Sequence, residues 1–115
     1  MQEVTPFVQV SRGKVRRIGT STRYRQKVTL VNTGGQALSG PLALALAGLT
    51  KGVRLDKASG KTKGLTPVGS PYRVLDPGVG PLLPGQARTF TIRFRNPLGK
   101  KIKYTPRVLA GVGDP

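Results

Sequence analysis

Strict alternation of apolar and polar residues predicts strands in three segments of the chain, each with one face in contact with water. In residues 23–32, Tyr24, Val28 and Leu30 share one parity, while the other parity is mostly cationic or polar. Residues 89–95 and 101–110 repeat this two-residue period. Side chains point alternately to the two faces of a strand, so the period predicts half-buried β-strands and no helix.

Residues 41–48 combine helix-forming residue types with the period of a strand. Leu and Ala alternate here, and both are strong helix formers. The segment is short, however, and Gly40–Pro41 and Gly48 bracket it, so we predict a strand. Its second face is small and apolar, which allows a neighbouring strand, sheet or subunit to approach closely. This face consists of Ala43, Ala45 and Ala47.

Shorter strand candidates and turn signals complete the predicted fold. The further candidates are residues 4–10, 14–18, 53–56 and 72–75. Turns rich in Gly, Pro, Asn or Asp separate the strands, at residues 32–35, 57–60, 76–78, 83–85 and 96–99. Seven to eight short strands with this spacing predict an all-β fold, an immunoglobulin-like antiparallel β-sandwich that forms one domain over residues 1–115.

The composition excludes several kinds of chemistry. The 115 residues include 20 Lys plus Arg, 4 Asp plus Glu, no Cys and no His, for a formal net charge of +16. The sandwich is therefore held without a disulfide, and the chain lacks thiol nucleophiles and the usual zinc ligands. Four scattered carboxylates do not suggest an acid/base pair. We expect no enzymatic activity, no metal site and no cofactor. No apolar run approaches the length of a membrane span, so we also expect no membrane insertion.

Several motifs give the chain a family resemblance. They are residues 28–35 (VTLVNTGG), 37–42 (ALSGPL), 48–55 (GLTKGVRL), 69–72 (GSPY), 83–86 (LPGQ) and 104–111 (YTPRVLAG). With them the chain resembles the immunoglobulin-like or fibronectin type III-like modules of large bacterial exported proteins. The resemblance implies a β-sandwich, an extracellular or cell-surface setting as part of a larger protein, and a spacer, adhesion or binding role without catalytic residues. Such modules are usually neutral or acidic, so the basic charge is where function should be sought.

One group of cations lies near a predicted hairpin. If residues 96–100 form its turn and the flanking strands pair symmetrically, Arg95 faces Lys101 and Arg93 faces Lys103. Like charges opposite each other are unfavourable, so a sheet with no use for them would include Glu or Thr. The whole predicted patch consists of Arg93, Arg95, Lys100, Lys101, Lys103 and Arg107.

A second group places seven cations within residues 12–27, without a carboxylate. If residues 14–18 form an edge strand beside the last strand, Lys14 and Arg16 join the hairpin patch. The outer face of residues 23–27 would then lie on the opposite sheet. The candidate binding residues of this group are Lys14, Arg16, Arg23, Arg25 and Lys27.

These cations predict a non-enzymatic module that binds polyanions. Lys and Arg neutralise phosphates and release counterions. The rings of Tyr24, Phe90, Phe94 and Tyr104 take the inward parity, which disfavours base stacking on single strands. Duplex DNA bound through its backbone phosphates, with little sequence specificity, is therefore the favoured ligand, and we expect a monomer.

Other interpretations stay open. The module could meet anionic surface polymers as an adhesion or spacer domain, or the charge could be a solvated face that limits aggregation. A structural domain that assembles through its alanine face is a further alternative. The sequence does not decide between DNA, RNA and polysaccharide.

Overall fold

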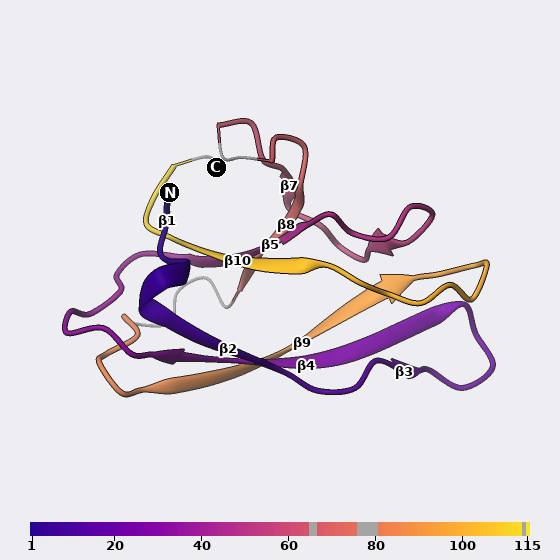
Figure 1. Cartoon of the computed structure of the whole chain (residues 1–115), viewed down its shortest axis with the longest axis horizontal. Coiled ribbons are helices and arrows are strands. Elements are labelled where there is room, and N and C mark those ends of the chain that lie inside the picture. Colours follow the sequence, from indigo (N-terminus) through magenta and orange to yellow (C-terminus); the bar gives the residue numbers. More distant parts are fainter. Residues whose placement is uncertain (65–66, 76–80, 114) are drawn as a thin grey trace.

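The computed structural model describes residues 1–64, 67–75, 81–113 and 115, which form two antiparallel sheets packed face to face (Figure 1). Sheet A has the strand order β1 (Gln2–Glu3), β10 (Thr105–Ala110), β5 (Leu42–Ala47), β8 (Pro71–Leu75) and β7 (Gly60–Lys61). Sheet B has the order β2 (Val8–Arg12), β4 (Arg23–Asn32), β9 (Ala87–Arg95) and β6 (Arg54–Leu55), with β3 (Arg16–Arg17) also paired to β4. A short 3₁₀ turn, η1 (Thr5–Phe7), precedes β2. The predicted all-β, disulfide-free sandwich of immunoglobulin-like kind is confirmed.

Two of the three alternating patterns give the strands that they predict, and the third, residues 101–110, forms a strand only from Thr105 onward. β4 spans the whole predicted segment of residues 23–32, and β5 is a strand although its residues favour a helix. Both faces of β5 are buried, which explains its unbroken apolar sequence. Four of the described strands, β1, β3, β6 and β7, are only two residues long.

The core lies between the two sheets and contains the inward side chains of both. Phe94, Leu30 and Leu44 are among its largest fully buried members. Tyr24 and Phe90 pack against this core, and Tyr104 is buried within it, so the predicted inward orientation of these rings is confirmed. The Phe94 and Tyr104 ring centroids lie 6.0 Å apart.

The outer face of sheet A is covered by the chain itself. Ala43 and Ala45 are buried there together with Leu109. Both termini lie on this side of the molecule, above sheet A in Figure 1. The Met1 amino group donates to the Val112 carbonyl at 2.8 Å, and the Gly64 amide donates to the Pro115 carbonyl at 2.9 Å. The alanine face therefore packs within the chain.

The predicted hairpin after Arg95 is wrong, because the chain crosses from sheet B to sheet A at this turn. β9 pairs with β4 and β6 on its two sides, so no edge is left for the following segment. The Asn96 side chain holds the turn: its amide donates to the Lys100 carbonyl at 2.7 Å, and its oxygen accepts from the Lys100 amide at 3.0 Å. The last strand begins only at Thr105 and pairs with β5 and β1.

Residues 101–103 form hydrogen bonds with the loop that follows β5, and not with β9. The Thr50 amide donates to the Lys103 carbonyl at 3.0 Å, and the Thr50 hydroxyl donates to the Lys101 carbonyl at 2.9 Å. Lys101 and Lys103 therefore do not face Arg95 and Arg93 across a ladder.

The predicted pairing of residues 14–18 with the last strand is also wrong. β3 pairs with β4, as β2 does, so these two short strands follow the same edge of sheet B. The predicted turn at residues 76–78 lies outside the described residues. Within the described ranges, no helix is long and apolar enough to cross a membrane.

Candidate polyanion-binding face

Arginines form two rows across the outer face of sheet B. In the first row, Arg25 on β4 lies between Arg16 on β3 and Arg93 on β9. In the second row, Arg95 on β9 lies between Arg23 on β4 and Arg54 on β6. All of these side chains are exposed. We call this set the arginine face: Arg16, Arg23, Arg25, Arg54, Arg93 and Arg95.

The alternation of each strand places these side chains outward. Tyr24 and Phe94 separate the two rows and point into the core. Neighbouring strands lie about 4.8 Å apart, and side chains on the same face repeat about every 7 Å along a strand. Six guanidinium groups therefore share a small area, in which each has at least one other arginine directly beside it.

The arginine face occupies only one half of the outer surface of sheet B. Beyond Lys27 and Thr91 along β4 and β9, the outward positions become neutral. Thr29 and Thr89 share a hydrogen bond there, with their hydroxyl oxygens 2.9 Å apart. The charge is thus concentrated and is not spread evenly over the sheet.

Little negative charge opposes the arginine face. The Asp56 carboxylate lies 3.7 Å from Arg95 Nε, and the Arg95 side chain is still 56% exposed. No other arginine of the face has a carboxylate within 4 Å among the described residues. Like charges directly opposite one another destabilise a sheet, so an anion placed over the two rows would remove a repulsion that the free protein bears.

A groove of about 510 Å³ runs along the first row, beside the irregular segment that joins β2 to β3. The Gly13 amide donates to the Lys27 carbonyl at 2.9 Å, which keeps this segment on the edge of sheet B. The groove is lined by Gly13, Lys14, Arg16, Arg25, Gln26, Lys27, Thr91 and Arg93. It therefore presents five cations and no carboxylate.

A buried network beneath the groove fixes its edge. Gln26 donates to the Gly13 carbonyl at 2.9 Å and accepts a hydrogen bond of 2.5 Å from the Tyr104 hydroxyl. Burial raises the pKa of Tyr104 above its ordinary value, against the opposing effect of nearby Arg12. The phenol therefore stays neutral at pH 7 and keeps its proton for Gln26.

The structure brings together some cations of the two predicted groups, the one near the predicted hairpin and the one within residues 12–27. It places the other predicted cations elsewhere. Arg23, Arg25, Arg93 and Arg95 belong to adjacent strands of one sheet, where the sequence had suggested opposite sheets. Arg16, Lys14 and Lys27 join them through the groove. The expectation that Lys14 and Arg16 lie beside the last strand is wrong, but they line the same groove as Arg93.

The remaining predicted residues lie elsewhere. Lys100 donates through Nζ to the Lys51 carbonyl at 3.1 Å. Lys101 and Lys103 are exposed on the segment that crosses between the sheets. Arg107 lies on sheet A, where its Nη1 pairs with Glu3 Oε1 at 3.0 Å. These four residues are therefore outside the arginine face.

Arg54 is a member of the face that the sequence analysis did not assign. The alternation of Val53, Arg54 and Leu55 would have placed its side chain outward, since Val53 and Leu55 are buried. The sequence does not give the pairing of β6 with β9, which brings Arg54 beside Arg95.

Comparison with known proteins does not assign the chain to a family. No protein-family model matches the chain, and no curated protein matches it. The resemblance to modules of bacterial exported proteins, and the cell-surface setting that it implies, therefore stay predictions.

Proposed function

We propose that the protein is a non-enzymatic binding module that holds duplex DNA by its backbone phosphates, with little sequence specificity. The observation that carries this proposal is the pair of arginine rows on one half of sheet B, with Asp56 as their one carboxylate neighbour within 4 Å among the described residues. A merely solvated face would not require cations to be stacked against one another.

The chemistry of arginine favours phosphate as the partner. Its planar guanidinium presents paired N–H donors that fit two oxygens of one phosphate, and its charge persists at any physiological pH. Side chains on β3 and β6 are separated by three strand spacings, about 14 Å. This is close to the width of about 12 Å of the major groove, so the two edges of the face can contact phosphates of both DNA strands.

The uncharged part of the same sheet favours contact with the backbone over reading of bases. Apart from Lys27, the outward neighbours of the arginine face on β4 and β9 are threonines, and the aromatic rings of these strands point into the core. Binding of single strands usually needs exposed rings on which bases stack. A surface with guanidinium groups and no ring provides backbone-directed affinity.

The salt dependence of DNA binding tests this proposal. If each of the six arginines engages one phosphate, the logarithm of affinity should fall with the logarithm of salt with a slope of about −5.4. Between 50 and 200 mM salt, the affinity for a 20-base-pair duplex would then fall roughly 2,000-fold. Fluorescence anisotropy of labelled duplex measures both quantities, with single strands and heparin as comparison ligands.

Two results would contradict the proposal. One is the absence of duplex binding at 50 mM salt. The other is tighter binding of heparin than of duplex at every salt concentration, which would favour a surface polysaccharide as the partner.

A further inference from the structure

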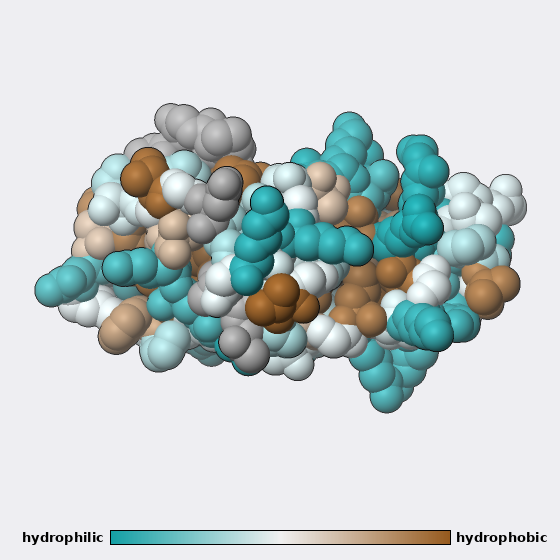
Figure 2. Space-filling view, turned by 90° about the horizontal axis from the view of Figure 1, so that it is seen from above, coloured by the Kyte–Doolittle hydropathy of each residue, from teal (hydrophilic) through white to brown (hydrophobic). Residues whose placement is uncertain are grey.

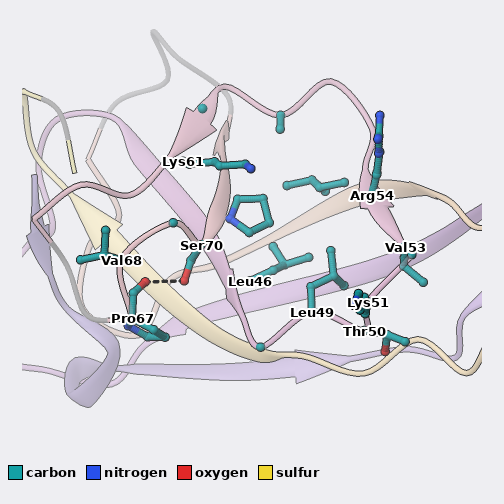
Figure 3. A pocket seen from close by; sticks show the side chains of 17 residues that line it. Leu46, Leu49, Thr50, Lys51, Val53, Arg54, Lys61, Pro67, Val68 and Ser70 are labelled. Atoms are coloured by element: carbon teal, nitrogen blue, oxygen red, sulfur yellow. Dashed lines mark hydrogen bonds between the residues drawn. The ribbon is translucent and has the colours of Figure 1, made fainter.

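The edges of the two sheets leave a hollow on one side of the sandwich, between β6 of sheet B and β7 of sheet A (Figure 3). Its volume is about 820 Å³, which lies within the range of small-molecule binding sites. We call it the β6–β7 pocket. It is formed mainly by the loop after β5, by β6 and β7, and by residues 67–71.

Apolar side chains line the base and one wall of the β6–β7 pocket. Leu46, Val53 and Leu55 are buried beneath it, and Leu49 is partly exposed to it. Val68 lines the pocket wall and is 67% exposed. From above sheet A, hydrophobic surface is visible between hydrophilic side chains (Figure 2). The pocket therefore offers apolar contact area that the free chain leaves partly in water.

Cations surround this apolar base. Lys51, Arg54 and Lys61 line the pocket and are exposed, and no carboxylate is among the described lining residues. Lys61 and Arg54 stand on opposite sides of the hollow in Figure 3. An anionic group held at the mouth would therefore meet positive charge from more than one direction.

Hydrogen bonds hold both walls in place without a ligand. On one wall, the Ser70 hydroxyl donates to the Pro67 carbonyl at 2.7 Å (Figure 3). The Thr62 hydroxyl donates to the same carbonyl at 3.1 Å. On the other, the Val53 amide donates to the Thr50 carbonyl at 3.0 Å. A pocket that is already formed loses little free energy to ordering when a ligand binds.

We propose that the β6–β7 pocket binds a small amphipathic anion, with an apolar chain against Leu49 and Val68 and a carboxylate between Lys51 and Lys61. A medium-chain fatty acid has this chemistry. A neutral apolar molecule would leave the cations unused, and a small anion without a chain would leave the apolar base in water. The proposal is independent of DNA binding, since Arg54 alone belongs to both the pocket and the arginine face.

Titration calorimetry of the full chain with decanoate, kept below its micelle concentration, tests the proposal. We expect saturable binding of one decanoate per chain, with affinity at least about 10-fold higher than for decanol or acetate. The double variant Lys51→Gln/Lys61→Gln should weaken decanoate binding by about 10-fold or more. The exposed pair Lys57→Gln/Lys63→Gln, which does not line the pocket, is the matched control and should change the affinity less than about 2-fold.

Amide chemical shifts supply a second measurement. Decanoate should shift the amides of residues 48–55 and 68–70 and leave those of β4 unshifted. Three results would overturn the proposal: no saturable binding, equal affinity for decanol and decanoate, or an equal loss in the control pair. Since all four lysines are exposed, both double variants should fold, and thermal melting checks this.

Discussion

The two outer faces of the sandwich differ in how their arginines are paired with other charged groups. On sheet A, the chain covers an apolar face around Ala43, and Arg107 is neutralised by Glu3 at 3.0 Å. On sheet B, Arg25 lies between two further arginines, Arg16 and Arg93, and all three side chains are exposed to solvent. One arginine thus has its partner within the chain, and the others have mainly each other.

This difference shows that the cations behind the net charge of +16 have different roles on the two faces. Arg107 contributes to the fold by joining β10 to the N-terminal strand β1 through Glu3. The arginine face contributes repulsion to the fold, and an external anion would convert that repulsion into attraction. The proposed function therefore rests on the outer face of sheet B. The outer face of sheet A shows, for comparison, an arginine that is neutralised within the chain.

The largest expected effect distinguishes the covered face from the open one. Ala43→Glu places a charge among Leu109 and Val74, at a position with no exposure, and should lower the free energy of unfolding by about 3 kcal/mol or more. Thr91→Glu, on the open face opposite Lys27, should cause no loss. Urea denaturation measures both variants. Equal stability of the two would mean that the chain does not cover Ala43 in solution.

A smaller effect concerns the internal ion pair. Arg107→Ala should lower the free energy of unfolding by about 1 kcal/mol, because Glu3 loses a charged donor at a partly buried site. A double-mutant cycle with Glu3→Ala should give a coupling free energy of about 0.5–1 kcal/mol. A coupling free energy near zero would show that this contact does not stabilise the fold.

The smallest effect has the opposite sign. Arg25→Thr removes the middle cation of the first row and replaces it with a residue that favours strands, so it should raise the free energy of unfolding by about 0.5 kcal/mol at low salt. The gain should shrink at 1 M salt, where charges are screened within about 3 Å. If the variant is less stable at low salt, the arginine rows do not repel each other in the free protein.

The sequence predicts the strands and their buried faces because both depend on local alternation. β4 and β5 follow directly from a two-residue period, and so does the outward orientation of Arg23, Arg25, Arg93 and Arg95. The candidate residues of the site were therefore largely accessible from the sequence.

The pairing of the strands was not accessible in the same way. Residues 96–100 have the composition of a hairpin turn, yet the chain changes sheets there, because β6 occupies the second edge of β9. Only this non-local pairing brings Arg54 beside Arg95 and separates Lys101 and Lys103 from the arginine face. Local residue patterns do not contain such long-range choices.

Matched charge reversals test the central claim most directly. Arg25→Glu/Arg93→Glu and Lys101→Glu/Lys103→Glu each lower the formal net charge by four, from +16 to +12, but only the first pair lies on the arginine face. Measured by anisotropy with the same duplex at 100 mM salt, the first pair should weaken DNA binding by about 100-fold or more, and the second by less than about 5-fold. Equal losses from the two pairs would contradict the account, because binding would then follow net charge and not the arginine rows.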